Sequence, residues 1–336
     1  MATSSALIPD YRLTVDGKDI TPTVAARLIS LRLEEKRDGS ADQLDLVLND
    51  TDGKLAIPKE GAVITVQLGW KQGTGVAPGL IDKGRFKVDE ASHSGPPDQV
   101  TVRARSADLT GDYRVRRERS WTDTTLGDVL GELAGANGLQ LSIDPDLRGV
   151  QIPALASHEK SDMALVRELG RRYDAVATVK AGKLIFNAKG KGQTPGGQSI
   201  PDTVIGRGAG DRHDYRRLER SKYGGAEARW HDSDVGGRKT VSAGSGQGKK
   251  KRLRRVYASE SAALEAASAE ARRVARGAAE LELNLAIGNA ALYPDRPCTV
   301  SGFKDEIDAH KWLISEVSHE LTKKGFRTKL KLETRG

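Results

Sequence analysis

Histidine, cysteine and carboxylate side chains are the groups that could carry acid–base, nucleophilic or metal chemistry. No two of the six histidines have the helical His-x-x-x-His spacing of a metal pair. They are His93, His158, His213, His231, His310 and His319. The single cysteine, Cys298, excludes an internal disulfide and any zinc site that needs two thiolates. We therefore predict no catalytic residues, no cofactor and no metal site, and we expect the protein not to be an enzyme.

Phosphate- and calcium-binding motifs are incomplete. Ala243 and Lys250 stand where a phosphate loop needs glycine and serine or threonine. The glycines at 206, 208 and 210 lack the third glycine of a dinucleotide-binding turn. Residues 49–53, Asn-Asp-Thr-Asp-Gly, lack the glutamate that closes a calcium loop, so a turn is the better interpretation.

Positive charge gathers in the last third of the chain. The 336 residues carry a net charge of +8, and residues 216–336 hold 25 basic against 16 acidic residues. Six basic residues lie within 249–255, directly after a Gly- and Ser-rich segment. Nucleic acid is one candidate ligand, but no interleaved aromatic residue could stack on bases. We therefore predict a solvated, flexible basic loop over 242–255, with DNA binding by 249–255 as the alternative.

The first third is typical of small β structures. Alternating apolar residues predict strands at 11–15, 44–48, 62–69, 84–88 and 100–105. Asp16-Gly17 suits a tight hairpin turn, and residues 94–97 join the last two strands as a hairpin. Short strands at this spacing indicate a small barrel or sandwich over 1–107.

The middle third changes character. Helical spacing predicts a helix capped by Asp123 or Thr124 and ended by Gly138, and a second helix after Ser161-Asp162. Strands are expected at 139–143, 175–179 and 183–186. Residues 108–215 therefore form a predicted α+β module that ends in a Gly-rich linker.

The last third, 216–336, is predicted to be β again around one helix. A strand is expected at 226–230, an Ala-rich helix at 259–279 and a strand at 280–287. Residues 311–333 predict a long hairpin that turns at 323–325.

An internal repeat links the two β parts. Residues 84–93 align without gaps with 310–319, and five pairs are identical or similar. These pairs are Phe86 with Trp312, Val88 with Ile314, Glu90 with Glu316, Ser92 with Ser318 and His93 with His319. Each segment is followed by a turn and another alternating strand. We therefore expect a duplicated barrel, with chance similarity between two hairpins as the alternative.

These segments together resemble one family, the late control D proteins. These are baseplate hub proteins of contractile-tailed phages and phage-tail-like bacteriocins, and the chain is also similar to the hub-like first part of type VI secretion spike proteins. The segments that carry the resemblance, in chain order, are 9–20, 42–50, 55–61, 121–126, 161–162, 182–186, 223–230, the Ala-rich helix and 312–326. One departure is Ala226, where the family pattern leads us to expect valine.

The resemblance implies a fold and an assembly. The fold class is α+β, mainly β, with two similar small tube-like β-barrel domains at 1–107 and 216–336 and a central α+β module. Three chains would form a homotrimeric, pseudo-sixfold ring that joins a sixfold tail tube to a threefold central spike. Its partners would be the spike protein, the tail tube or tube-initiator protein, the tape-measure protein and the baseplate wedge proteins, with DNA only as passing cargo.

The expected location follows from the same resemblance. The protein would be made in the host cytoplasm and lie in the tail baseplate of a virion or tail-like particle. The sequence shows neither a signal-peptide pattern at its start nor 18 consecutive apolar residues, so we expect no membrane insertion. Besides DNA binding, the remaining alternative function is a tail-associated cell-wall hydrolase.

Overall fold

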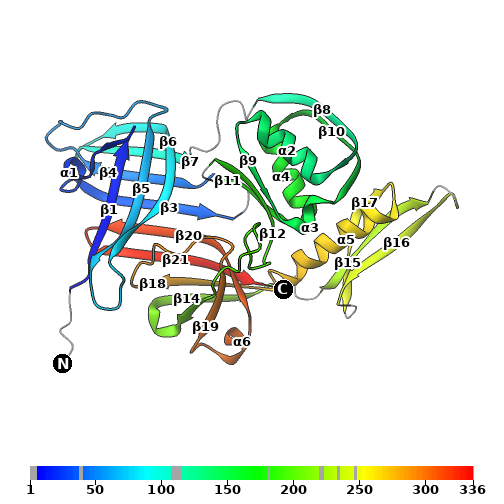
Figure 1. The fold of residues 1–336 in the computed structure, drawn as a ribbon. Helices are drawn as coiled ribbons and strands as arrows, with labels where there is room; N and C mark the ends of the chain where they lie inside the picture. The colour runs from blue at the N-terminus through cyan, green and yellow to red at the C-terminus, as the bar shows by residue number, and fades with distance from the viewer. Residues whose placement is uncertain are drawn as a thin grey trace.

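The protein is mainly β, as expected, with a few helices (Figure 1). A computed structural model describes residues 6–37, 41–106, 115–180, 182–218, 223–232, 235–245 and 248–335. The expected boundary after residue 107 lies outside the described residues. The described elements form two β units, a central module and an arm.

The first β unit is built from strands with one buried face. Its strands are β1 (Ile8–Val15), β2 (Lys18–Asp19), β3 (Leu28–Lys36), β4 (Gln43–Asn49), β5 (Val63–Gln72), β6 (Gly79–Ser94) and β7 (Gln99–Ser106), with the short helix α1 (Thr21–Val24). On β4, Leu44, Leu46 and Leu48 are buried and alternate with more exposed residues, as the period of two requires. The predicted hairpin of β6 and β7 is confirmed.

The second β unit combines the end of the chain with an earlier segment. Its elements are β13 (Thr203–Gly206), the short 3-10 helix η2 (Arg207–Ala209), β14 (Gly210–Arg217), β18 (Ala279–Leu285), β19 (Pro297–Ser301), α6 (Asp305–Asp308), β20 (Trp312–Thr322) and β21 (Gly325–Thr334). The predicted hairpin of β20 and β21 is confirmed. Strands β13 and β14 pair with β19 and β18, so the expected boundary between residues 215 and 216 falls inside β14.

The two β units have the same strand order. In the first, neighbours follow β3-β4-β7-β6-β5-β1, and in the second they follow β14-β18-β21-β20-β19-β13. All corresponding pairs are antiparallel except the last, because β13 runs parallel to β19 while β1 runs antiparallel to β5. The buried leucines of β4 correspond through this order to Leu281, Leu283 and Leu285 of β18.

Irregularities in the ladders repeat as well. The pairing of β6 with β7 shifts between Val88 and Glu90, and that of β20 with β21 shifts between Ile314 and Glu316. These are the residues that the sequence alignment matches. A second matching shift occurs between β3 and β4 at Leu28–Ser30 and between β14 and β18 at Gly210–Arg212. Because bulges are specific local features, their coincidence argues for duplication rather than chance.

The central module packs helices on a small sheet. Its elements are β8 (Arg116–Thr125), α2 (Leu126–Ala136), β9 (Gln140–Ile143), α3 (Pro145–Arg148), β10 (Gln151–Ser161), α4 (Asp162–Tyr173), β11 (Ala175–Lys180) and β12 (Lys183–Ala188). Helix α2 is capped by Thr125 rather than by Asp123 or Thr124, because β8 continues to Thr125. The sequence analysis had not predicted the β8–β10 ribbon.

The arm is inserted between β14 and β18. It consists of β15 (Tyr223–Asp232), β16 (Gly237–Gly244), β17 (Lys249–Tyr257) and α5 (Glu260–Ala275), and it projects from the body of the molecule (Figure 1). Ala228 on β15 packs against Ala263 and Ala267 of α5, so small side chains bring helix and sheet close together.

Two expectations for this region were wrong. The basic run 249–255 is not a loop but part of β17, which pairs in parallel with β15. Ion pairs from Lys251 to Glu270 and from Arg252 to Glu227 hold the basic strand to its own module. Helix α5 ends at Ala275 instead of residue 279, because Arg276 turns to an extended conformation and Gly277 adopts a φ of +75°.

Candidate functional site

The residues considered first for chemistry lie apart from one another. Within the described part of the chain, no three His, Cys, Asp or Glu side chains gather as a metal site. Cys298 is buried, and this burial raises the pKa of its thiol to about 12, which suppresses nucleophilic thiolate. His213 and His310 stack edge-on against Phe303 and Trp312. These positions are structural and do not converge on a cleft.

The best-defined polar and aromatic cluster lies instead at the seam between the two β units. There β3 of the first unit pairs antiparallel with the second half of β20, from Glu316 opposite Lys36 to Thr322 opposite Ser30. This pairing makes one continuous 13-stranded sheet of the two units. The relative position of the units is therefore fixed by main-chain hydrogen bonds as well as by side chains.

Three ionisable side chains are buried together at the seam. The Lys83 ammonium lies 2.5 Å from Oε2 of Glu35, and Nε2 of His319 lies 3.5 Å from the same oxygen. Lys83 also donates to the carbonyl oxygens of Ala290 and Leu292 in the second unit. Because all three side chains are almost excluded from water, each charge depends on its neighbours for stabilisation.

The surroundings set the charge states of this cluster. Burial alone would raise the pKa of Glu35, but the adjacent His319 imidazole and the charges of Lys83 and Lys180 lower it to about 2. Burial lowers the pKa of His319, so the imidazole is neutral at pH 7. Nδ1 of His319 lies 2.9 Å from the hydroxyl oxygen of Thr328. The seam thus holds an ionised Glu35–Lys83 pair beside a neutral histidine.

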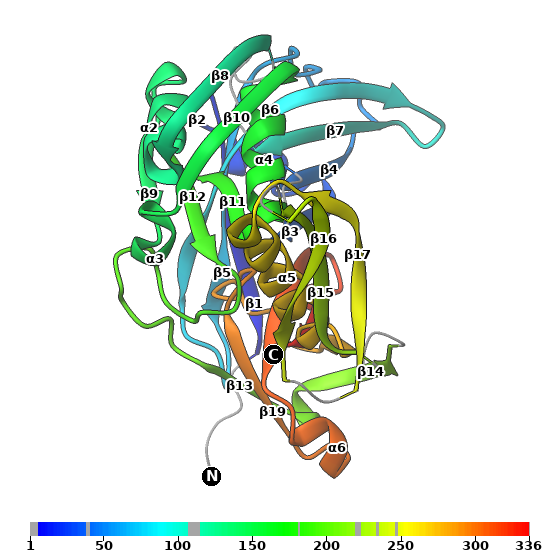
Figure 2. The same cartoon turned by 90° about the vertical axis from the view of Figure 1, so that its right-hand side faces the viewer.

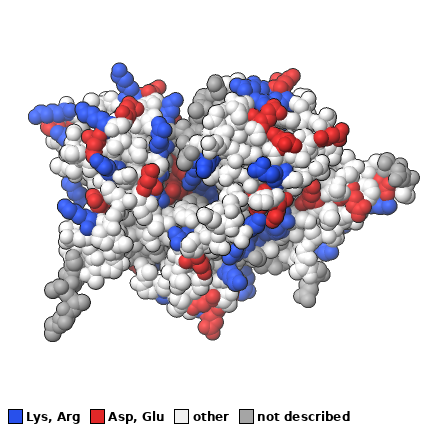
Figure 3. Space-filling view, in the orientation of Figure 1, with Lys and Arg blue, Asp and Glu red and all other residues white. Residues whose placement is uncertain are grey.

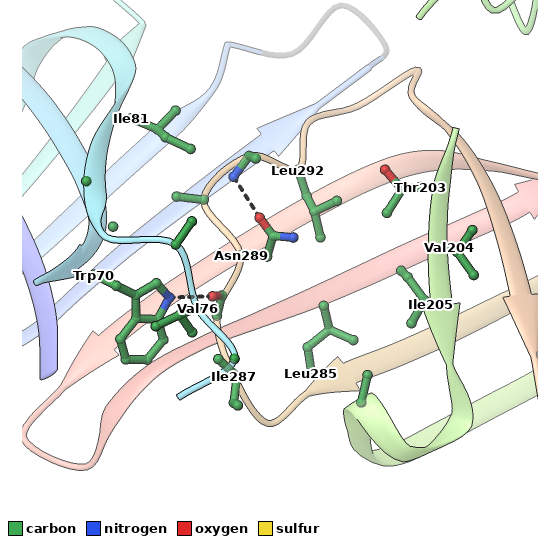
Figure 4. A pocket seen from close by; sticks show the side chains of 18 residues that line it. Trp70, Val76, Ile81, Thr203, Val204, Ile205, Leu285, Ile287, Asn289 and Leu292 are labelled. Atoms are coloured by element: carbon green, nitrogen blue, oxygen red, sulfur yellow. Dashed lines mark hydrogen bonds between the residues drawn. The ribbon is translucent and has the colours of Figure 1, made fainter. Parts of the chain in front are cut away.

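An aromatic contact closes the same seam. The indole N–H of Trp70, on β5, donates to the carbonyl oxygen of Gly288 at 2.9 Å, and its ring centroid lies 5.5 Å from that of Phe326 on β21. Gly288 is required there, because an added Cβ would lie 2.6 Å from the Phe326 ring. Beside Trp70, a hollow of about 420 Å³ opens between the units (Figure 4).

The hollow is apolar. Trp70, Val76 and Ile287 line one side, and Ile205, Leu285 and Leu292 line another (Figure 4). No charged residue lines it among the described residues. Such a lining offers no acid or base, so it suits apolar contacts rather than catalysis.

A second polar cluster joins all four parts of the molecule. Arg37, after β3, contacts Glu333 at 2.7 Å and Asp295 at 4.0 Å. Arg276, after α5, pairs with Asp174 at the end of α4 and lies 3.4 Å from Glu333. The cluster therefore holds the arm and the central module against both β units.

The buried Asp295 carboxyl should make stability depend on pH. Burial raises its pKa to about 6, against the opposing effects of Arg37 and of the backbone N–H of Gly190. A raised pKa stabilises the fold below the ordinary value near 4, and this contribution is lost as the pH rises through 6. The free energy of unfolding of Asp295→Asn, measured relative to that of the wild type, should therefore rise by roughly 2–3 kcal/mol from pH 4 to pH 7.5.

The measurement is urea unfolding of both proteins across that pH range. Asparagine suits the left-handed φ of +68° at this position, and Glu333 continues to pair with Arg37, so the variant should fold normally. The other carboxyl groups contribute equally to both proteins, so their effects cancel when one curve of unfolding free energy against pH is subtracted from the other. A difference between the two proteins that stays constant with pH would contradict the prediction.

The sequence analysis found only part of the seam. It singled out His93 and His319 as a matched pair, but it did not find Glu35, Lys83 or Trp70. The partners of these residues in the second unit lie more than 200 positions away along the chain, for example Gly288 for Trp70. A lysine and a tryptophan in alternating strands carry no local signal for such contacts.

The molecular surface carries both signs of charge. Lys and Arg are interspersed with Asp and Glu over the face seen in Figure 3. Among the described residues, no helix has the length and apolar character needed to cross a bilayer. This mixed face gives no single field that would attract a polyanion.

The fold is similar to those of solved phage-tail and secretion-system proteins. The 43 kDa tail protein of prophage MuSo2 from Shewanella oneidensis has a similar fold, with a TM-score of 0.69 and 15% identity over 97% of this chain and 98% of that chain. The c3393 protein of E. coli, a type VI secretion component, has a TM-score of 0.52 and 14% identity, over 95% of this chain and 76% of that chain. These likenesses extend over almost the whole chain and concern the fold.

Sequence comparison defines the family. The model of the phage tail baseplate hub (GPD) family matches residues 43–325. The probable baseplate hub protein of Escherichia phage P2 is 39% identical over 370 aligned positions, which cover 98% of this chain and 94% of that protein. The chain therefore belongs to the phage tail baseplate hub (GPD) family, and it is a structural component of the tail baseplate.

Proposed function

We propose that this hub acts as a homotrimeric, pseudo-sixfold ring that joins the tail tube to the central spike. The observation that carries the proposal is the repeated strand order of the two β units, which includes two matching ladder shifts. Three chains with two similar units each present six similar surfaces toward a sixfold tube. The threefold symmetry of the three whole chains matches the symmetry of a threefold spike.

The ring requires interfaces that are heterologous and close on rotation. The seam shows how two such units can join, because β3 of one unit extends the sheet of the other. In this role the protein makes no bond and breaks none, and its work is to hold partners in register. The proposed partners are the spike, the tube or tube-initiator protein, the tape-measure protein and the wedge proteins, with DNA passing through.

Solution mass tests the ring directly. Light scattering on a sizing column should give a species near three times 36.2 kDa, either alone or with the spike protein. A trimer that forms only with the spike would make assembly dependent on that partner. A monomer under both conditions would overturn the proposal.

A further inference from the structure

The internal seam provides a template for contacts between copies. In the matched strand order, β14 corresponds to β3 and β6 corresponds to β20. The seam uses one edge of β3 and the second half of β20. The counterparts of these two edges are still open: within the described residues, β14 pairs only with β18, and residues 89–94 of β6 pair only with β7.

The corresponding strand pairings of the two units give each seam residue a counterpart on the open edges, and these counterparts define a register. In the seam, Val317 lies opposite Glu35 and Ser318 lies opposite Glu34. Through the pairings of β6 with β7 and of β20 with β21, Val317 corresponds to Ala91 and Ser318 to Ser92. Through the pairings on β4 and β18, Glu35 corresponds to Arg217 and Glu34 to Arg216.

We propose that β14 of one copy pairs antiparallel with residues 91–94 of β6 in the next copy. The transferred register sets four facing pairs, which are Arg217 with Ala91, Arg216 with Ser92, Tyr215 with His93, and Asp214 with Ser94. The proposal rests on the ring of the proposed function and specifies its second interface. Each chain then uses the same joint twice, once internally and once with its neighbour.

Shape and exposure favour this pairing. The β6–β7 hairpin extends well beyond the neighbouring strands, so a second chain can reach its edge (Figure 2). Ser92 and His93 are exposed, as are Arg216 and Arg217. Open strand edges are usually paired or covered in soluble assemblies, and the pairing would cover both of these.

The charged side chains at the two edges already have ion-pair partners within the chain. Arg216 pairs with Asp214 and Arg217 with Glu306, while Asp89 and Glu90 pair with Arg105 and Arg103 on β7. His93 already lies 3.5 Å from the buried carboxylate of Asp50. In the transferred register Arg217 would exchange its partner Glu306 for this His93–Asp50 pair, in the position that Glu35 takes beside His319. The two joints therefore share geometry while differing in the sign of the incoming charge.

Disulfide trapping tests the register. Ser92→Cys combined with Arg216→Cys should form a disulfide between neighbouring copies, because facing strand residues lie within disulfide range. The native Cys298 is buried and stays out of the reaction. In a closed ring each chain bonds to both neighbours, so a covalent trimer should predominate on a non-reducing gel and dissociate to monomers on reduction.

Matched controls separate this proposal from the ring itself. Ser92→Cys with Asp214→Cys shifts the pair by two residues, out of disulfide range, and should give little trimer. Each single cysteine variant should give none. The experiment is run under the conditions in which light scattering gives the trimer, with the spike present if it is needed.

The outcomes are distinct. A trimer by light scattering without a disulfide in the matched pair, or with equal trapping in the shifted pair, would overturn this strand pairing and leave the ring intact. Covalent chains longer than three would overturn closure. A chain that stays monomeric with and without the spike would overturn the ring and this pairing with it.

Discussion

Lys83→Met is expected to lower the free energy of unfolding by roughly 3–5 kcal/mol at pH 7. The substitution keeps the length of the side chain but removes the cation that lies 2.5 Å from Glu35. The Glu35 carboxylate would then be buried beside His319, with only the more distant Lys180 ammonium 3.9 Å from its other oxygen. An uncompensated buried charge costs more than the ion pair itself contributes.

Lys87→Met provides the matched control, because Lys87 lies on the same strand with an exposed side chain. Chemical denaturation should show a change below about 0.5 kcal/mol for this variant. The difference in unfolding free energy between Lys83→Met and the wild type should also become smaller at acidic pH. Glu35 has a lowered pKa, so its stabilising contribution is present above the ordinary value near 4.5 and is lost toward pH 2. Equal effects of the two lysine variants at pH 7 would contradict the prediction.

Local pattern explains why the hairpins could be predicted. Apolar alternation around a turn is a property of neighbouring residues, and it placed both β6–β7 and β20–β21 correctly. The alignment of His93 with His319 also matched Glu90 with Glu316, and both glutamates follow a ladder shift in the structure. The repeat was therefore visible in the sequence because both copies keep the same bulge and the same inward residues.

Contacts between distant segments could not be predicted in this way. The run 249–255 was expected to be a loop because its charges hide the β pattern, but Leu253 and Tyr257 still pack beneath α5. Likewise, the insertion of the arm between β14 and β18 depends on which strands pair across more than 60 residues. Composition identifies each element, but only tertiary pairing decides to which unit it belongs.

Trp70→Ala is the second substitution with a large expected effect. It should lower the free energy of unfolding by about 3–5 kcal/mol. The change removes a buried ring, its contact with Phe326 and the hydrogen bond to Gly288. Trp70→Phe keeps most of the ring but loses the donor, so its cost should fall to about 1–2 kcal/mol. Denaturant unfolding measures both values, and equal costs would show that the hydrogen bond, not the ring, holds the seam.

The Trp70 variant also connects stability with assembly. Trp70 contacts the second unit across the seam, and the proposed ring of three chains could close only if both units kept their relative angle. Trp70→Ala should therefore lower the fraction of trimer even at temperatures where the monomer remains folded. Trp121→Ala is the control, because Trp121 lies in the central module and its indole N–H donates to Glu132. If both variants lost trimer equally, the defect would come from general destabilisation; a loss confined to Trp70→Ala would assign it to the angle between the two units.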